Sequence, residues 1–101
     1  MRIRILRSAR RTVADGIRFY ESQQAGLGAY FLSSIMSDLR SLHIYAGIHQ
    51  IHNETYFRMV CSKFPYSIYH RKDGIKVDVY AVLDDRRDPK RNEDFLDRIG
   101  P

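Results

Sequence analysis

Apolar and basic residues alternate at the start of the chain. Ile3 and Ile5 alternate with Arg2 and Arg4. A repeat of two places the isoleucines on one side of an extended chain and the arginines on the other. This segment is therefore predicted to be a short strand with one buried face.

Helical spacing replaces this alternation in the next segment. Ser8 is a candidate N-cap, and beyond it three apolar residues recur three or four positions apart: Val13, Ile17 and Tyr20. Arg11 and Arg18 fall on the opposite face of such a helix. The pattern predicts an amphipathic helix that ends near Gly26.

A second helical pattern runs from about Leu27 to Tyr45. Its apolar stripe has five members: Leu32, Ile35, Met36, Leu39 and Leu42. Gly47 suits the end of this helix, because glycine accepts the left-handed conformation that often follows a helix. The short link between the two helices predicts an antiparallel helical hairpin.

The remaining chain has mostly strand character. Residues 48–53 are polar and rich in histidine, and we expect a loop there. Strand-like runs follow at residues 55–61, 64–71 and 76–83, the last two joined by a hairpin turn at Asp73-Gly74. In the last run we expect one apolar face, formed by Val77, Val79, Ala81 and Leu83.

A short helix is predicted at the end of the chain. Asp88 can cap it, Pro89 suits its first turn, and Phe95, Leu96 and Ile99 supply its apolar side. The elements together predict a single α+β domain over residues 1–101. We expect an N-terminal strand, an antiparallel helical hairpin packed on a mainly antiparallel three- to four-stranded sheet, and a short C-terminal helix.

Charge adds information about partners. The net charge is +5, and six of the first eighteen residues are arginines against one acid, Asp15. Such a surface fits an acidic protein or a nucleic acid, although a solvated face explains it equally well. No apolar run or leader pattern is apparent and Cys61 is the single cysteine, so we expect a cytoplasmic protein without a membrane segment.

Three stretches of the chain together resemble the RelE/ParE toxin superfamily. Residues 17–31 (IRFYESQQAGLGAYF) are similar to the helix–turn–helix segment of these toxins, which often contains FYE followed by GLG and F. Residues 64–71 (FPYSIYHR) resemble the family strand FPYxIYYR, and residues 81–89 (AVLDDRRDP) resemble AVLHxRRDP. The resemblance extends over residues 3–97, and the family has the same order of elements.

The resemblance implies the toxin of a bacterial type II toxin–antitoxin pair. Such a toxin is neutralised in a hetero-oligomer by a cognate antitoxin, often through an acidic segment, and we expect Arg4, Arg11 and Arg18 to contact it. The family divides by target: RelE-like members cut messenger RNA on the ribosome, whereas ParE-like members inhibit DNA gyrase.

A RelE-like mechanism would need cations to stabilise the phosphorane and an acid–base pair to move protons. The candidate phosphate-clamping residues of the sheet are Arg58, Lys63, Arg71, Arg86 and Arg87. The acid–base partner is incomplete, because Asp84 replaces the family histidine and no Tyr or His follows Tyr80. Asp84 and Asp85 would repel a phosphate, or hold the neighbouring arginines in ion pairs.

These departures favour a binding-type toxin with a gyrase-type target. A ribosome-dependent messenger-RNA endonuclease stays open as the alternative, as does an inactive relative that only binds its antitoxin. The target would then be DNA gyrase or the ribosome with its messenger RNA, and no membrane partner is expected.

The other candidate residues point to structure rather than chemistry. We interpret His70 as a residue on the sheet surface and Cys61 as a small core residue. His43, His49 and His52 lack further ligands at metal spacing apart from Glu54, so no metal site and no cofactor are predicted.

Overall fold

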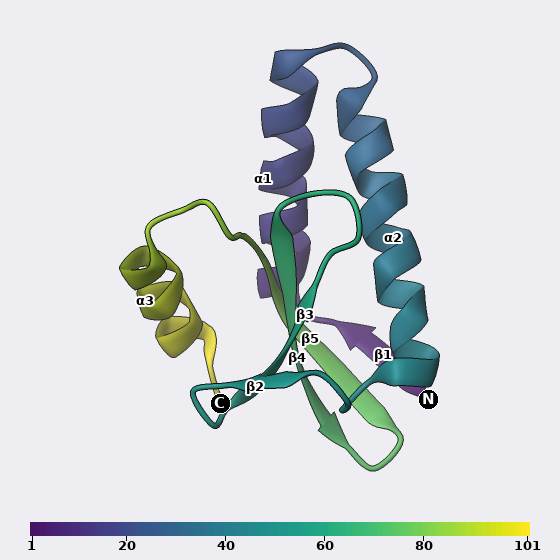
Figure 1. The fold of residues 1–101 in the computed structure, drawn as a ribbon, viewed down its shortest axis with the longest axis vertical. Coiled ribbons are helices and arrows are strands. Elements are labelled where there is room, and N and C mark those ends of the chain that lie inside the picture. Colours follow the sequence, from purple (N-terminus) through teal and green to yellow (C-terminus); the bar gives the residue numbers. More distant parts are fainter.

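The computed structural model describes residues 1–101 as five strands and three helices (Figure 1). In chain order these are β1 (Arg2–Ile5), α1 (Arg7–Gln23), α2 (Leu27–Tyr45), β2 (Gln50–His52), β3 (Tyr56–Val60), β4 (Tyr66–Asp73), β5 (Lys76–Asp84) and α3 (Pro89–Ile99). The predicted α+β class and order of elements are confirmed. No helix combines the length and the hydropathy needed to cross a membrane.

The strands form one sheet in the order β1-β5-β4-β3-β2. Strand β1 pairs with β5 in parallel, and the other three pairings are antiparallel. The sheet is therefore mainly antiparallel, as predicted. It has one strand more than expected, because β2 forms within residues 48–53, where the polar composition had predicted only a loop.

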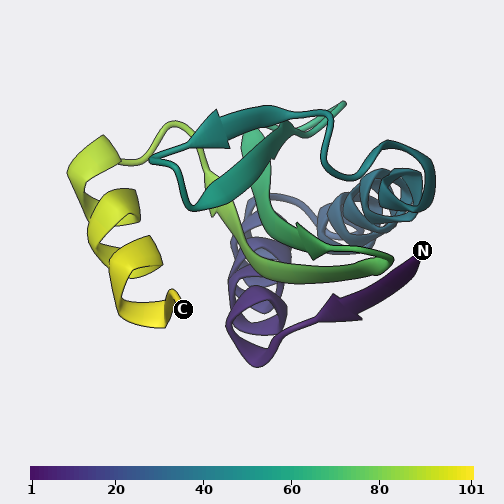
Figure 2. The same ribbon diagram turned by 90° about the horizontal axis from the view of Figure 1, so that it is seen from below.

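The two faces of the sheet carry different layers (Figures 1 and 2). On one, the inner face, α1 and α2 enclose the main core, which includes Phe31, Ile35, Leu42, Ile68 and Val79. On the other, the outer face, α3 covers a smaller cluster around Leu96, which we call the outer cluster: Tyr56, Tyr69, Ala81, Leu83 and Leu96. The predicted packing of the helical hairpin on the sheet is confirmed.

A β-bulge at Tyr80 reverses the side of the sheet to which the following residues of β5 point. His70 is paired with Val79 and Tyr69 with Ala81, so Tyr80 has no partner in β4. Past the bulge the alternation is inverted: Val77 and Val79 lie in the main core, whereas Ala81 and Leu83 lie in the outer cluster. The predicted single apolar face of β5 is therefore wrong.

Two local predictions also fail. Leu6 is the N-cap of α1, and the Ser8 hydroxyl instead donates a hydrogen bond to the carbonyl oxygen of Tyr80 at 2.6 Å. In the stripe of α2, Leu32 and Met36 are exposed, because the sheet and α1 cover only the side that holds Ile35 and Leu39.

The predicted helix ends are otherwise confirmed. The Asp88 carboxylate accepts a hydrogen bond from the Lys90 amide at 3.0 Å, with Pro89 in the first turn of α3. Gly47 has a φ of 89°, the left-handed conformation expected after α2. A Cβ atom at Gly16 would lie 2.6 Å from the ring of Phe31, so this glycine permits the close contact of α1 with α2.

Candidate functional site

The turn after β5 fixes one of the predicted phosphate-clamping residues in an ion pair. The guanidinium of Arg86 donates two hydrogen bonds to the Asp84 carboxylate, at 3.1 and 3.0 Å, and a third to the Tyr20 hydroxyl at 3.2 Å. Burial opposes ionisation of Asp84, but these hydrogen bonds outweigh it and lower the pKa of the carboxyl. Arg86 is thus neutralised and held against α1.

A second ion pair lies on the outer face. Nη2 of Arg58 is 3.1 Å from Oδ1 of Asp85, and the Ser67 hydroxyl donates to Oδ2 of Asp85 at 2.8 Å. Burial alone would lower the pKa of Arg58, yet its hydrogen bond with Asp85 raises it. The expectation that the adjacent aspartates hold their neighbouring arginines in ion pairs is confirmed for Asp84, which binds Arg86, and is wrong for Asp85, which binds Arg58 of β3.

A cleft of about 240 Å³ opens beside this second pair, between β2, the sheet and the start of α3. Its lining is mainly polar: Gln50, Ile51, His52, Arg58, Tyr69, Asp85, Pro89 and Asn92. The Asn92 amide donates to the Asp84 carbonyl oxygen at 3.0 Å, which ties α3 to the turn. We call this the α3 cleft.

His52 lines the α3 cleft and supplies its imidazole group. Its Nε2 is 3.0 Å from the Glu93 carboxylate, and its ring packs edge-on to Tyr69 at a centroid distance of 5.4 Å. A histidine hydrogen-bonded to a carboxylate is an arrangement that enzymes use for proton transfer, and Arg58 lines the same cleft. Sequence reasoning missed this pair, because His52 and Glu93 lie 41 residues apart and no local motif connects them.

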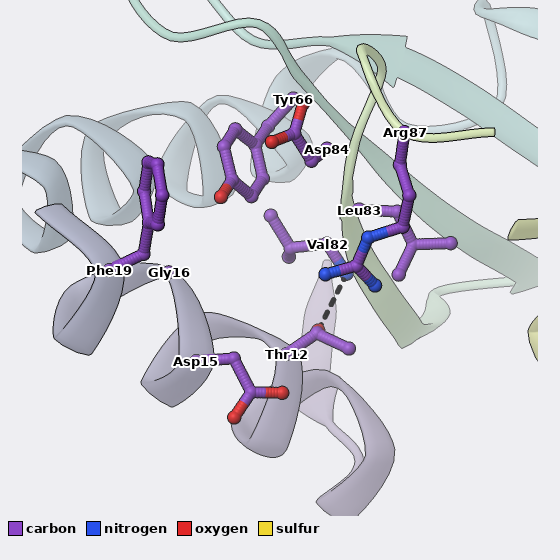
Figure 3. A pocket seen from close by; sticks show the side chains of 9 residues that line it. All are labelled: Thr12, Asp15, Gly16, Phe19, Tyr66, Val82, Leu83, Asp84 and Arg87. Atoms are coloured by element: carbon purple, nitrogen blue, oxygen red, sulfur yellow. Dashed lines mark hydrogen bonds between the residues drawn. The ribbon is translucent and has the colours of Figure 1, made fainter.

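A smaller pocket of about 160 Å³ lies between α1 and β5 (Figure 3). Phe19 and Tyr66 stand at one end, the Arg87 guanidinium reaches over Thr12 and Val82, and the Thr12 hydroxyl accepts a hydrogen bond from the Val82 amide at 3.0 Å. Burial raises the pKa of Tyr66 to about 12, so this phenol stays protonated at neutral pH and supplies no phenolate base. The pocket has the size of one side chain or a benzene-sized molecule.

The structure does not unite the five predicted phosphate-clamping residues. Arg58 and Arg71 lie on the outer face, and Arg87 lines the pocket beside α1. Arg86 is bound to α1, and Nζ of Lys63 lies 5.4 Å from the centre of the Tyr30 ring in α2. The five cations therefore do not form one phosphate-binding site, and only Arg58 and Arg71 share a face of the sheet.

The three predicted antitoxin contacts also divide between surfaces. Arg11 and Arg18 are exposed on α1, seven residues apart and therefore on one side of the helix. Arg18 pairs with Asp15. Arg4 lies on the outer face instead, where it makes two hydrogen bonds of 3.0 Å with Asp78.

The other candidates are buried or tied to the backbone. His70 is fully buried, not on the sheet surface as predicted, because β4 turns it toward the inner face between Phe57 and His49. Cys61 belongs to the main core, as predicted, and burial raises the pKa of its thiol. The structure contains no group of three or more His, Cys, Asp or Glu side chains suited to a metal ion.

Comparisons with known proteins support the fold but not a sequence family. No model of a protein family matches the sequence, and no curated protein matches it either. Among solved structures, a chain described as "Chromosomal ParDE TA system from P. aeruginosa" superimposes with a TM-score of 0.74. The match covers 81% of this chain and 92% of that chain, with 13% identity. The fold is thus similar to that of a chain from a toxin–antitoxin system.

Proposed function

We propose that the protein is a binding-type toxin of a type II toxin–antitoxin pair. It acts in the cytoplasm by engaging a macromolecule, with DNA gyrase as the favoured target, and an antitoxin neutralises it in a hetero-oligomer. The similarity of fold to a chain of the ParDE system supports the toxin–antitoxin class.

One observation carries the choice of a binding toxin over a nuclease. Two of the five phosphate-clamping candidates, Arg58 and Arg86, are each neutralised by an aspartate, and the other three lie apart from one another. A phosphate would have to displace a carboxylate from each of the two neutralised arginines and would meet the repulsion of that carboxylate. A toxin that only binds a protein target needs no free clamp.

The exposed side of α1 is the surface that we propose for the antitoxin. Arg11 and Arg18 lie there, and Phe19 beside them is 46% exposed. A basic surface with an exposed aromatic ring suits an acidic amphipathic segment. Replacement of Arg11 and Arg18 by Gln should weaken the antitoxin complex at least tenfold, and replacement of Lys90 and Arg98 in α3 serves as the control.

Induced expression without the antitoxin tests the proposal. Translation and DNA replication are followed separately by pulse labelling, and purified protein is added to a gyrase supercoiling assay. We expect replication to stop first and supercoiling to be inhibited. Translation stopping first, together with cleaved messenger RNA, would contradict the gyrase target, and the absence of growth arrest would support an inactive relative.

The His52–Glu93 pair supports a second candidate function, a metal-independent messenger-RNA endonuclease in the α3 cleft. His52, oriented by its bond to Glu93, would take the proton of a 2′-hydroxyl, whose oxygen then attacks the adjacent phosphorus. Arg58 would stabilise the charged phosphorane, and a protonated imidazole would return the proton to the leaving 5′-oxygen. This reaction consumes no cofactor and leaves a cyclic phosphate and a 5′-hydroxyl.

Substitutions in this pair separate the two candidates. If the protein is a nuclease, His52→Gln and Glu93→Gln should each reduce RNA cleavage and growth arrest at least a hundredfold. In a binding toxin both variants should arrest growth as the unchanged protein does. His43→Gln is the matched control, because His43 is exposed near the end of α2 and its ring hydrogen-bonds only to the Met1 carbonyl oxygen.

A further inference from the structure

The outer face has an open, strongly charged end beyond α3. It lies where β1 runs beside the β4–β5 hairpin, the lower end of the sheet in Figure 1. Ile3, Ile5, Val77 and Val79 pack in or against the main core, so their neighbours in sequence must point to the outer face. The pairing then sets these neighbours in two rows across the strands, Arg2–Lys76–Asp73 and Arg4–Asp78–Arg71.

Two adjoining hollows mark this surface. The larger, of about 480 Å³, is lined by Arg4, Arg71, Lys72, Asp73, Lys76, Asp78 and Tyr80. The smaller, of about 220 Å³, shares Arg4, Lys76 and Asp78 with it and adds Arg2. We call the two together the basic trough.

Positive charge dominates the basic trough and is mostly unpaired. Four cations of the outer face, Arg2, Arg4, Arg71 and Lys76, stand against two carboxylates, and one of these, Asp78, is already held by Arg4. Lys72 pairs with the inward-facing Val77, and its side chain lies against Gly47 instead. Arg2, Arg71 and Lys76 take part in none of the ion pairs of the molecule. The trough therefore differs from the other end of the outer face, where Asp85 neutralises Arg58.

An aromatic ring closes the trough toward α3. Tyr80, the bulge residue, is half-buried, and its ring packs edge-on to Tyr56 at 5.3 Å. It is the one apolar residue in the lining of the larger hollow. An aromatic face among unpaired cations is the arrangement that binds single-stranded nucleic acids, since the cations contact phosphates and the ring stacks on a base.

We propose that the basic trough binds single-stranded nucleic acid through its phosphates, with Tyr80 as the stacking residue. An amphipathic peptide helix fits less well, because it requires an apolar groove that this lining lacks. The trough is separate from the α3 cleft and from the surface proposed for the antitoxin. It adds a nucleic-acid contact to a toxin whether its target is gyrase or messenger RNA.

The proposal is tested by fluorescence anisotropy, in which the protein is titrated into labelled twelve-nucleotide oligo-dT or oligo-U at several salt concentrations. For Arg71→Gln with Lys76→Gln we expect at least a tenfold loss of affinity at low salt. The slope of log affinity against log salt should also fall by about 0.7 for each contact removed. Tyr80→Leu should weaken binding about fivefold or more and leave the salt slope unchanged.

The matched control changes two cations on the helices, Arg10→Gln with Arg40→Gln, which lowers the net charge equally and lies outside the trough. If the control variant loses as much affinity for the oligonucleotides as the trough variants, binding depends on net charge alone and the proposal is wrong. Competition by polyglutamate as strong as that by the oligonucleotides would also overturn the proposal, since it would indicate an acidic peptide. The assay uses neither antitoxin nor growth arrest, so its failure leaves the proposed toxin function untouched.

Discussion

The two faces of the sheet differ in what holds them together. On the inner face, the side chains of α1, α2 and four strands form one continuous apolar core, with Phe31 in contact with the rings of Tyr20, Phe64 and Tyr66. On the outer face, the outer cluster is small and the rest is charged. The inner face accounts for the stability of the fold, and the outer face holds most of the groups available for recognition.

This difference has an energetic consequence. Burial of apolar surface is the main stabilising contribution in a small domain, whereas partly exposed ion pairs contribute about 0–1 kcal/mol each. Substitutions on the inner face should therefore unfold the whole domain. Those on the outer face should change local order or binding and leave the domain folded.

The largest expected effect is that of Phe31→Ala on the inner face. Phe31 is fully buried, and its loss leaves a cavity between α1, α2 and the β3–β4 loop. We expect a loss of about 4 kcal/mol in the free energy of unfolding, measured by urea denaturation. The adjacent Leu32→Ala, at an exposed position, should cost less than about 1 kcal/mol. Similar losses in both variants would mean that the inner face is not the main source of stability.

His70 makes the inner face sensitive to acid. Burial, together with the nearby His49, lowers the pKa of His70 to about 4 from an ordinary value of 6.5. A group whose pKa is depressed by folding binds protons more tightly when unfolded, so its stabilising contribution is full above about pH 6.5. It is lost as the pH falls toward 4 and amounts to at most about 3 kcal/mol.

His70→Leu should remove this part of the acid sensitivity. Neither ring nitrogen of His70 has a hydrogen-bond partner, so at neutral pH the variant should be as stable as the unchanged protein or more stable. Urea denaturation at pH 7 and pH 4.5 measures the difference. The control His43→Leu, at the exposed end of α2, should lose as much unfolding free energy between pH 7 and pH 4.5 as the unchanged protein. If His70→Leu loses as much too, His70 is not the source of the acid sensitivity.

The sequence predicts the inner face better than the outer one. Helical periodicity places Val13, Ile35 and Leu42 correctly, because a buried stripe must repeat every three to four residues. The bulge at Tyr80 leaves no such trace, since one unpaired residue inverts the face of everything after it. His70 was misplaced for a related reason, because composition does not tell which face of a two-layered sheet an imidazole enters.

The pairs that define the candidate sites depend on long-range contacts. Arg58 meets Asp85 and His52 meets Glu93 only when β2, β3 and the start of α3 come together. The adjacency of Asp84 and Asp85 to Arg86 and Arg87 in the sequence predicts the Asp84–Arg86 pair, but it does not predict the pair of Asp85 with Arg58. Pairs separated by many residues follow from the topology, which no local pattern contains.

On the outer face, Leu96→Ala should act locally. Leu96 is the buried residue by which α3 contacts the outer cluster, and its truncation should cost about 2 kcal/mol. Because α3 can detach while the inner face stays folded, hydrogen exchange should accelerate in residues 93–99 and remain slow in β5. Asp97→Ala, one residue on and exposed, should leave exchange unchanged. Faster exchange throughout β5 would show that α3 is part of the main cooperative unit.

The smallest effect is expected for Asp85→Asn, which removes the charge that neutralises Arg58. The Ser67 hydroxyl can still donate to the new amide oxygen, so the loss of stability should be about 1 kcal/mol. Asp78→Asn, in the more exposed pair with Arg4, should cost less than about 0.5 kcal/mol. Arg58 freed in this way becomes a phosphate ligand in the α3 cleft, so anisotropy should show tighter binding of oligo-U by Asp85→Asn than by Asp97→Asn, which removes an exposed carboxylate outside both the α3 cleft and the basic trough. If Asp85→Asn binds no more tightly, the ion pair is not what keeps phosphate from this end of the outer face.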